Sequence, residues 1–320
     1  MTLTRQTDKI TIPDRLPFLE AICWQTANVY RFTPEEMLSR YERGWQYRDL
    51  FGDINDEELN FIRKLAQYYR SWLQSETMTF KFDLHDKILT ILDRLNCELL
   101  KERSVCFGGG TLLAIAFGEY RLSKDIDLIV NAPGYKHLRN SIFDRGYEAL
   151  FRDFANIQIG RKTSDRYGIR MSIGVDNLPI KTEIIVEARF NLDPPQYLEW
   201  SPVPCLSLSD CFTSKLLANA DRFMDSSVES RDLIDLAVLR LQSPLPDSAV
   251  RKAENAYEVM RPLKQAVQQF QERANYRDKC FVSLQIDKTQ IPKIIDGLDL
   301  LAADLELDPT ERTFQEQHDS

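Results

Sequence analysis

The first 80 residues carry apolar positions at the three- and four-residue spacing of amphipathic helices. Thr33-Pro34-Glu35-Glu36 supplies an N-cap, a first-turn proline and a capping-box glutamate, so we expect a helix of roughly ten residues to follow. Asn55 and Glu58 mark a second helix start, which precedes an apolar stripe made of Leu59, Ile62, Leu65, Ala66, Tyr69 and Leu73. We predict an N-terminal helical extension over residues 1–80, whose role is unknown.

The middle of the chain alternates between helical and strand patterns. Helical periodicity marks three segments, at 84–100, 112–117 and 135–145. Strand patterns mark four others, at 105–107, 125–130, 168–175 and 180–190. The last two flank Asp176-Asn177-Leu178-Pro179, whose composition suits a hairpin turn. This order predicts an α+β (mixed α/β) core over residues 81–200, with helices packed on a small mixed sheet.

Prolines separate this core from a helical C-terminal region. Pro194-Pro195 and Ser201-Pro202-Val203-Pro204 precede helices that we expect to begin near Ser207 and Ser230. Further along, we predict a long charged helix over 246–277, a short strand over 281–286 and a helix over 292–305. The predicted organisation is completed by a helical C-terminal domain, 201–310, and a flexible tail, 311–320.

Composition narrows the class of protein. A chain of 320 residues that is 43% apolar can bury a full core and form two or three compact units. The net charge of −8 argues against non-specific nucleic-acid binding. A local basic cluster interrupts this acidic balance, and it is either a solvated loop or edge strand or a contact for RNA: Arg161, Lys162, Arg166 and Arg170.

Cysteine and histidine usage limits the chemistry. The six cysteines include no CxxC pair, so we expect reduced core residues. The three histidines are far apart, which leaves carboxylates to carry any reaction. No apolar stretch is long enough for a bilayer, and the first residues lack the apolar segment of a signal peptide. These features predict a cytoplasmic protein without membrane association.

The most informative pair of residues is Asp125 and Asp127. On a strand, residues two apart project from the same face, while Ile126 between them points into the core. Two such carboxylates repel one another unless a divalent cation is shared, and hard oxygen ligands favour Mg²⁺ or Mn²⁺. The same spacing also occurs on ordinary surface strands, so the neighbouring residues decide the interpretation.

A glycine turn precedes this pair. Gly108-Gly109-Gly110-Thr111 follows a predicted strand and opens a helix, where backbone N–H groups can bind a phosphate. The alternative is a tight turn that needs positive φ, although three successive glycines exceed that need. Arg121 and Ser123 would add a guanidinium fork and a hydroxyl donor close to the carboxylates.

These residues together carry a family resemblance. Gly109-Gly110-Thr111-Leu112-Leu113, followed by Gly118-x-x-Arg121-x-Ser123-x-Asp125-Ile126-Asp127-Leu128, closely resembles the first motif of the AbiEii/AbiGii-type toxin nucleotidyltransferases. These enzymes include the MenT-like toxins and belong to the polymerase-β nucleotidyltransferase superfamily. The resemblance covers roughly residues 100–240 and implies a polymerase-β-type nucleotidyltransferase core.

A second motif of the family is matched on the strand predicted over 180–190. Lys181-x-Glu183 resembles the basic-x-acidic motif, in which Glu183 would be the third metal-binding carboxylate and Lys181 a phosphate or structural contact. Glu187 lies on the same face of that strand and is the rival for the third carboxylate.

Two further motifs fall in the helical region. Lys215-x-x-Ala218-x-x-x-Arg222 resembles the third motif, in which the lysine contacts the triphosphate. Residues 231–236 resemble the fourth, whose acidic residue is implicated in activity; Asp232 is the first choice and Asp235 the second. Without the preceding motifs, this region would indicate only a lattice of surface ion pairs.

The resemblance implies metal-dependent transfer of a nucleoside monophosphate (NMP) from a nucleoside triphosphate (NTP), with release of pyrophosphate. Asp125, Asp127, Glu183 and Asp232 would be catalytic, and the first three would hold the metal. The expected NTP-binding residues are Gly109, Gly110, Thr111, Arg121, Ser123, Lys181 and Lys215.

The expected biological role is the toxin of a toxin–antitoxin system that acts on tRNA and is controlled by a cognate antitoxin. Two alternatives stay open. The acceptor could be a small molecule or a protein, or the chain could be a catalytically silent nucleotide-binding or interaction module.

Overall fold

The computed structural model describes residues 10–51, 54–69, 71–73, 77 and 80–317. The chain divides into two compact units, Met1–Thr79 and Phe80–Ser320. Each unit has a hydrophobic core of its own.

The first unit is built from helices: α1 (Pro17–Ile22), η1 (Val29–Arg31), α2 (Pro34–Gly44), η2 (Trp45–Leu50) and α3 (Asp56–Tyr69). Thr33 and Glu36 form the predicted capping box, and Asn55 Oδ1 accepts a hydrogen bond from the Glu58 N–H, so both predicted helix starts are confirmed. The buried Glu58 carboxylate accepts hydrogen bonds from the N–H groups of Phe18 and Leu19 and from the Tyr41 hydroxyl. It thereby links α3 to α1 and α2.

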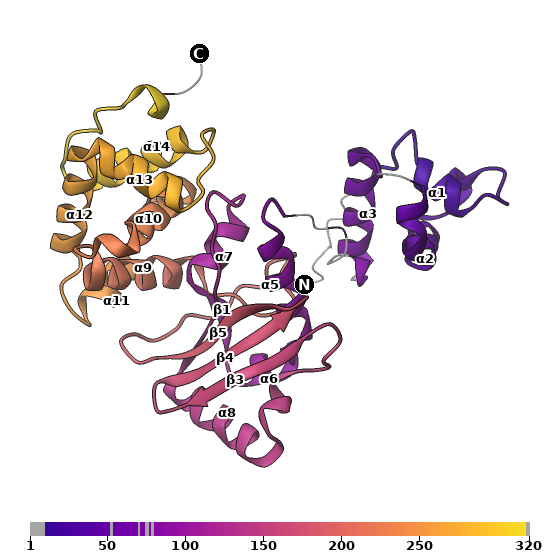
Figure 1. Ribbon diagram of the computed structural model, residues 1–320, viewed down its shortest axis with the longest axis horizontal. Coiled ribbons are helices and arrows are strands. Elements are labelled where there is room, and N and C mark those ends of the chain that lie inside the picture. The colour runs from indigo at the N-terminus through magenta and orange to yellow at the C-terminus, as the bar shows by residue number, and fades with distance from the viewer. Residues whose placement is uncertain (1–9, 52–53, 70, 74–76, 78–79, 318–320) are drawn as a thin grey trace, which may run out of the picture. The chain divides into compact units, whose positions relative to one another are not determined.

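The second unit contains a five-stranded sheet in the order β1-β2-β5-β4-β3 (Figure 1). The strands are β1 (Cys106–Gly108), β2 (Ile126–Asn131), β3 (Gln158–Ser164), β4 (Gly168–Val175) and β5 (Leu178–Glu187). The β2–β5 pair is parallel and the other pairs are antiparallel. A mixed sheet with packed helices confirms the predicted fold class. The hairpin between β4 and β5 is also confirmed, since Asp176 and Asn177 both have the positive φ that a two-residue turn requires.

The two faces of the sheet differ in polarity. Leu128, Ile184 and Ile169 lie opposite one another on β2, β5 and β4, and all three are buried. Helices α5 (Asp83–Arg94) and α8 (Ala132–Arg145) contact these strands. The residues adjacent to these in sequence form a polar row across the same three strands: Asp127, Glu183 and Arg170. Because successive side chains on a strand alternate, this row lies on the opposite face.

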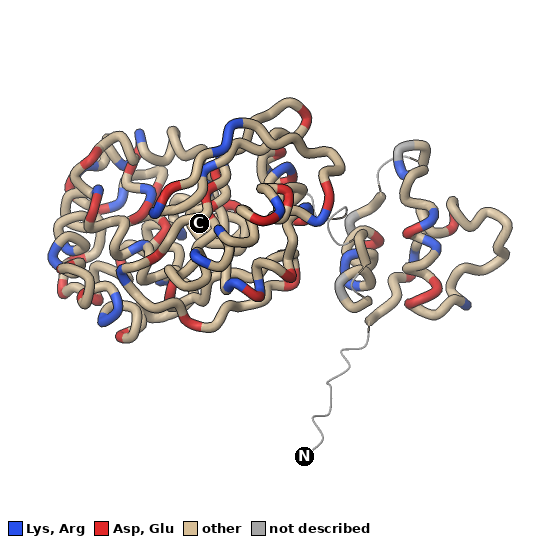
Figure 2. The backbone as a smooth tube through the Cα atoms, turned by 90° about the horizontal axis from the view of Figure 1, so that it is seen from below, with Lys and Arg blue, Asp and Glu red and all other residues tan. Residues whose placement is uncertain are grey.

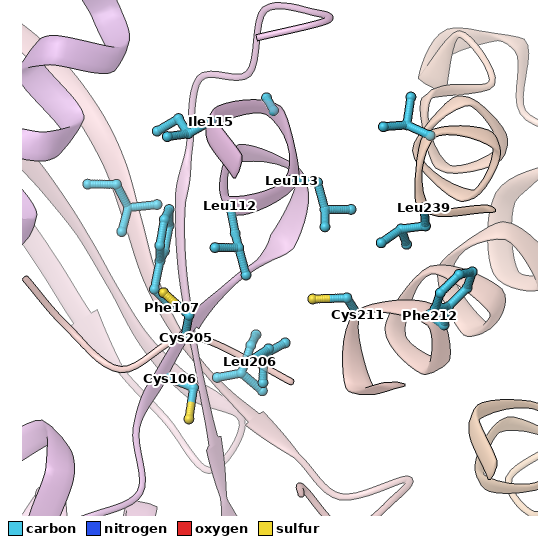
Figure 3. Packing of buried hydrophobic residues seen from close by; sticks show 14 of the residues in the cluster. Cys106, Phe107, Leu112, Leu113, Ile115, Cys205, Leu206, Cys211, Phe212 and Leu239 are labelled. Atoms are coloured by element: carbon cyan, nitrogen blue, oxygen red, sulfur yellow. The ribbon is translucent and has the colours of Figure 1, made fainter. Parts of the chain in front are cut away.

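Helix α7 (Gly109–Ala116) connects the sheet to the C-terminal helices. In Figure 3, Leu112 lies on the side of Phe107 of β1, whereas Leu113 points toward α9 and α10. Those two helices span Leu208–Arg222 and Arg231–Gln242. One hydrophobic core therefore continues from the sheet through α7 into the helical region.

The helical region departs from the prediction between residues 246 and 286, whereas the helix predicted over 292–305 is confirmed. The single helix expected over 246–277 is wrong, because the chain forms α11 (Asp247–Glu254), α12 (Met260–Glu272) and α13 (Ala274–Ser283) instead. The strand expected over 281–286 is also wrong. Phe281 lies in α13 and packs against Phe270 of α12, with ring centroids 6.1 Å apart. Periodicity alone does not distinguish helix from strand in such a short apolar run. Helix α14 (Ile291–Asp304) follows.

Two differences occur near the sheet. The helix predicted over 84–100 is interrupted, because Leu95 is extended and Asn96 caps a new helix, α6 (Cys97–Glu102). The strand β3 was not among the segments with a strand pattern, and an edge strand was only one interpretation of the basic cluster that includes Arg161 and Lys162. This edge strand is almost entirely exposed, so it lacks the alternation of apolar and polar residues that reveals a half-buried strand.

The C-terminal segment is packed, which corrects the flexible tail predicted over 311–320 for residues 311–317. Glu316 of η5 (Phe314–Glu316) and Arg277 of α13 are both fully buried, and their side chains form a two-pronged ion pair of 2.6 and 2.9 Å. One buried ion pair thus outweighs the polar composition of the segment. Residues 318–320 lie outside the described residues.

All six cysteines are free, and five are buried, which confirms the prediction of reduced core residues. Burial raises the pKa of Cys106 to about 12, so its thiol is unreactive near neutral pH. No helix in the described part of the chain has both the length and the apolar character required to cross a membrane.

Candidate active site

Asp125 and Asp127 lie at the beginning of β2. Ile126 between them is fully buried, as the alternation of a strand requires. Both acidic side chains are partly buried, and among the described residues neither carboxylate has a hydrogen-bond or ion-pair partner. Two neighbouring carboxylates are therefore available to a ligand.

The glycine turn lies against this pair. Gly109 begins α7 with a φ of +70°, and a Cβ at this position would be 2.1 Å from Asp127 Oδ2. At Gly110 a Cβ would be 2.2 Å from an Arg121 terminal nitrogen. The turn thus needs one positive φ and two close approaches. The N-cap residue, Gly108, makes no side-chain cap, which leaves the first N–H groups of the helix open to an anion.

Hydrogen bonds of Thr111 hold the segment that carries Ser123 and Asp125. The Thr111 hydroxyl donates to the Asp125 carbonyl oxygen over 2.6 Å and lies 2.8 Å from Ser123 Oγ. Thr111 is buried, whereas Ser123 is partly exposed. In this arrangement Thr111 holds the backbone at Asp125, and the side chain of Ser123 stays partly exposed.

Glu183 lies directly beside Asp127. The two residues are partners in the parallel register of β2 and β5, so their side chains share a face. Lys181 pairs with the Glu183 carboxylate, and Arg170 of β4 lies 3.3 Å from its Oε1. Basic groups thus border the third predicted carboxylate.

Glu187, the rival of Glu183, occupies a different environment. It is the register partner of Asn131, at the far end of β2 from Asp127. Its buried carboxylate is held by both arms of the Arg189 guanidinium, at 3.0 and 2.7 Å. Glu187 is therefore remote in register from the aspartate pair and already neutralised.

Lys215 of α9 and Asp232 of α10 form the core of a buried ion network. Lys215 Nζ lies 3.0 Å from Asp232 Oδ1 and 2.6 Å from Asp235 Oδ2. Arg222 also binds Asp232 through two nitrogens, at 2.6 and 2.9 Å. Burial opposes ionisation of Asp232, but Lys215 and Arg222 outweigh it and hold the pKa of Asp232 well below its ordinary value.

Asp235 joins this network to the first motif. It accepts two hydrogen bonds from Arg121, of 2.6 and 2.8 Å, and one of 2.6 Å from the Tyr120 hydroxyl. Arg121 is only 3% exposed. The guanidinium predicted to grip a phosphate is thus occupied by a carboxylate 114 residues away in sequence. The sequence predicted that Arg121 binds the triphosphate. In the structure its guanidinium binds Asp235 and lies behind Gly110, which is the position of a structural support.

The buried ion network contains more cations than carboxylates. Three cations, Arg121, Lys215 and Arg222, meet two carboxylates, Asp232 and Asp235, so the network carries one net positive charge. Burial raises the pKa of Asp127; Lys215 opposes this shift, whereas the charges of Asp125 and Glu183 add to it. An anionic pair therefore lies beside a cationic network.

The carboxylates have the donor chemistry for a divalent cation. Within the described ranges, no three His, Cys, Asp or Glu side chains are already arranged around a common metal position. Asp125 and Asp127 nevertheless provide two partly buried, unpaired carboxylates, and Glu183 provides a third from the next strand. Oxygen ligands of this kind suit Mg²⁺ or Mn²⁺.

The basic cluster at 161–170 is divided between the faces of the sheet. Arg170 faces the carboxylate side, where it contacts Glu183. Lys162 pairs with Met171 in register and lies over the Tyr147 ring at 4.8 Å, on the helix-covered side. Elsewhere in the second unit, acidic and basic positions are interspersed along the chain (Figure 2). The edge-strand position expected for the cluster is confirmed for Arg161 and Lys162, and an RNA contact stays a prediction.

A buried network near the site, centred on His85 and Glu119, was not predicted from the sequence. His85 of α5 is fully buried; its Nδ1 lies 2.6 Å from Glu119 Oε1 and its Nε2 3.0 Å from the Ser123 carbonyl oxygen. Glu119 also accepts hydrogen bonds from the N–H groups of Lys81 and Phe82. This network fixes the loop before Asp125. The local signal was weak: His85 occupies an inward position of α5, and Glu119 lies in the loop between α7 and β2.

A glycine turn at a helix start, two aspartates on the adjoining strand and a carboxylate beside them on the next strand define the class of protein, a nucleotidyltransferase. Residues 90–317 match the family model described as the nucleotidyl transferase AbiEii toxin of type IV toxin–antitoxin systems. The chain belongs to this family, which confirms the resemblance seen in the motifs. NTP is the substrate class of such an enzyme, and the family implies a cognate antitoxin.

Solved structures from two organisms are similar to the chain. A protein from Helicobacter pylori described as a candidate nucleotidyltransferase has 16% identity, with 72% of this chain and 98% of that chain covered and a TM-score of 0.43. JHP933 from Helicobacter pylori has 14% identity, with 71% of this chain and 95% of that chain covered and a TM-score of 0.42. The nucleotidyltransferase toxin MenT4 from Mycobacterium tuberculosis has 14% identity, with 84% of this chain and 99% of that chain covered and a TM-score of 0.24. No curated protein sequence matches the chain. Because these TM-scores are low, the family assignment rests on the match over 90–317.

Proposed function

We propose that this chain is a metal-dependent toxin that transfers an NMP from an NTP to the 3′ end of tRNA. The observation that carries the proposal is the pairing of Asp127 with Glu183 across β2 and β5, next to an Asp125 carboxylate that has no partner among the described residues. Three carboxylates on one face, beside an open helix N-terminus, suit a triphosphate with its cation.

In the proposed reaction, an oxygen of the acceptor hydroxyl bonds to the α-phosphorus of the NTP. The bond from that phosphorus to the oxygen that bridges to the β-phosphate breaks, pyrophosphate leaves with the electron pair, and the hydroxyl proton is released. A divalent cation held by Asp125, Asp127 and Glu183 would offset the charge of the triphosphate and lower the pKa of the hydroxyl.

The other motif residues divide into phosphate contacts and supports. The N–H groups of Gly109 and Gly110 and the Ser123 hydroxyl would bind phosphate oxygens. Lys215 uses two of its three ammonium donors on Asp232 and Asp235, so one is left for the triphosphate.

Thr111, Arg121 and Asp232 would act through these contacts. Thr111 holds Asp125, Arg121 lies behind Gly110, and Asp232 fixes Lys215. Lys181 would partly neutralise Glu183 before the cation is bound.

Exposed cations on the carboxylate face support an RNA acceptor. Arg170 and Lys181 are each about half exposed and border Glu183 from β4 and β5. A phosphate backbone that approaches along these strands would meet both cations and bring its terminal hydroxyl toward the carboxylates.

The test offers each of the four NTPs, labelled at the α-phosphate, to the enzyme with total tRNA, with protein or with small molecules, with Mg²⁺ and with a chelator. We expect Mg²⁺-dependent label on tRNA 3′ ends. Asp127→Ala should abolish incorporation, whereas the surface control Asp144→Ala should retain it. Label on protein or small molecules alone would refute the tRNA acceptor. Incorporation by a folded Asp127→Ala protein would refute the metal site.

A further inference from the structure

A cavity lies among the C-terminal helices, next to the ion network. Its volume is about 130 Å³, and its lining comes from α9, α10, α12, α13 and η4 (Ser226–Val228). The walls include the aromatic side chains of Phe223, Phe270 and Tyr276. A dry cavity of about 150 Å³ accepts a benzene ring, so this cavity, which is slightly smaller but open on one side, is comparable in size to an aromatic ring.

Asn219 on α9 lines this cavity and lacks the contacts that a buried amide needs. Its side chain is 2% exposed, and its Nδ2 is enclosed without a hydrogen-bond partner among the described residues. A buried N–H donor without a partner costs about 1–3 kcal/mol. A ligand in the cavity that accepts a hydrogen bond from Nδ2 would remove this cost.

Helix α9 connects the cavity to the proposed triphosphate contact. Lys215, Asn219 and Arg222 are spaced by four and three residues, so they form one stripe. Four residues of helix rise about 6 Å. Asp232, which binds both Lys215 and Arg222, also lines the cavity. The cavity thus begins one helical turn from the residue that would hold the triphosphate.

We infer that this cavity receives the nucleobase of the NTP and that the Asn219 amide binds the base edge. The inference rests on the proposed function, because it assigns one part of the same substrate. A carboxamide presents a donor and an acceptor side by side, which matches the paired donor and acceptor groups on a base edge. The aromatic walls suit the flat faces of the base.

The test measures equilibrium binding by titration calorimetry without any acceptor. The ligands are the Mg²⁺ complexes of ATP, GTP, CTP and UTP, with inorganic tripolyphosphate as a probe without a base. Asn219→Leu keeps the side-chain size and removes both hydrogen-bonding groups. We expect it to weaken binding of the preferred NTP about tenfold and to leave tripolyphosphate binding unchanged. The unfolding midpoint of the free protein should stay the same or rise, because an unpaired buried amide is removed.

A second variant fills the cavity without touching a polar group. Ala266 of α12 lines it, and Ala266→Leu should also weaken NTP binding but not tripolyphosphate binding. Asn140→Ala, an exposed asparagine of α8, serves as the matched control.

The outcomes separate the inference from the proposed function. If the wild-type protein binds none of the NTPs, the proposed function fails. If it binds an NTP and both cavity variants bind that NTP equally well, only the inference fails. A second titration measures binding of an RNA 3′ end; cavity variants that bind this RNA more weakly and the NTP equally well would also overturn the inference, because the base in the cavity would then belong to the acceptor.

Discussion

Asp127 on β2 and Glu183 on β5 are direct neighbours in the parallel register of the sheet. Four residues further along, the same register pairs Asn131 with Glu187, whose carboxylate is held by Arg189. The sheet therefore places two glutamates of one strand face in different surroundings, and we expect their substitution to have different effects.

We expect Glu183→Gln to lower kcat on the order of 10²-fold or more, because it removes a charge beside the reacting phosphates. Glu187→Gln should keep the activity of the folded enzyme and reduce its stability, since Arg189 loses its buried carboxylate partner and keeps only its Nη1 contacts with Asp221 and Tyr257. Single-turnover transfer from labelled NTP and urea unfolding measure the two effects. The assignment fails if Glu187→Gln is the inactive variant and Glu183→Gln transfers normally.

Gly109→Ala tests the contact between the turn and Asp127. Its Cβ would collide with Asp127 Oδ2, so we expect the carboxylate to move and kcat to fall by roughly 10²-fold. Gly118→Ala is a matched control, because Gly118 also has a positive φ, +80°, but no atom lies within 4 Å of the added Cβ. Both variants carry backbone strain. If Gly109→Ala and Gly118→Ala lose the same amount of activity, backbone strain alone explains the loss and the contact with Asp127 does not.

Asp235→Asn tests the buried ion network. The substitution leaves the Arg121 charge buried without its carboxylate, so the free energy of unfolding should fall by about 3–5 kcal/mol. Asp304→Asn removes the partner of Arg240 in a more exposed pair of the same two-pronged geometry and should cost less than about 1 kcal/mol. Urea denaturation gives both values. A similar loss in the two variants would contradict a special role for the buried pair.

The Arg277–Glu316 pair predicts a pH dependence of stability. Burial opposes ionisation of Glu316, but Arg277 outweighs it and lowers the pKa of Glu316 below its ordinary value of 4.5. The pair therefore stabilises the fold fully above this ordinary value, and the contribution is lost as the pH falls through the lowered pKa. At pH 7, Glu316→Gln should reduce the free energy of unfolding by about 3 kcal/mol.

Thermal unfolding of wild type and Glu316→Gln across pH 7 to 3 measures this effect. The difference between their midpoints should be constant near neutrality and shrink below pH 4.5. Glu311→Gln, an exposed neighbour, should match the wild type throughout. A difference that persists undiminished at pH 3 would show that the carboxylate charge is not the cause.

Local patterns were sufficient for much of the fold. The two-residue alternation put Asp125 and Asp127 on either side of a buried Ile126, and the Thr33–Glu36 spacing identified a capping box that the structure contains. Asp176-Asn177 likewise marked the hairpin. These features depend on residues within about four positions of one another, where backbone geometry restricts the choices.

Local patterns failed where exposure or distant contacts decide. The β3 strand is exposed on nearly every residue and left no periodic signal, and the Phe281 segment became helical because it packs against Phe270. The C-terminal segment was polar enough to suggest disorder, yet Arg277 holds it through Glu316. In each case the energy that decides the structure comes from a partner remote in the sequence.

The sequence by itself determined the residue types of the candidate site and the faces that the acidic residues occupy, because strand and helix periods follow from local backbone geometry. Only the tertiary structure decided which residues become neighbours. The strand register places Glu183 beside Asp127, and the packing of α7 against α10 allows Arg121 to form an ion pair with Asp235. The assembly of the C-terminal helices encloses Asn219 beside a cavity. Pairing across long loops depends on the packing of the whole unit, which no local pattern encodes.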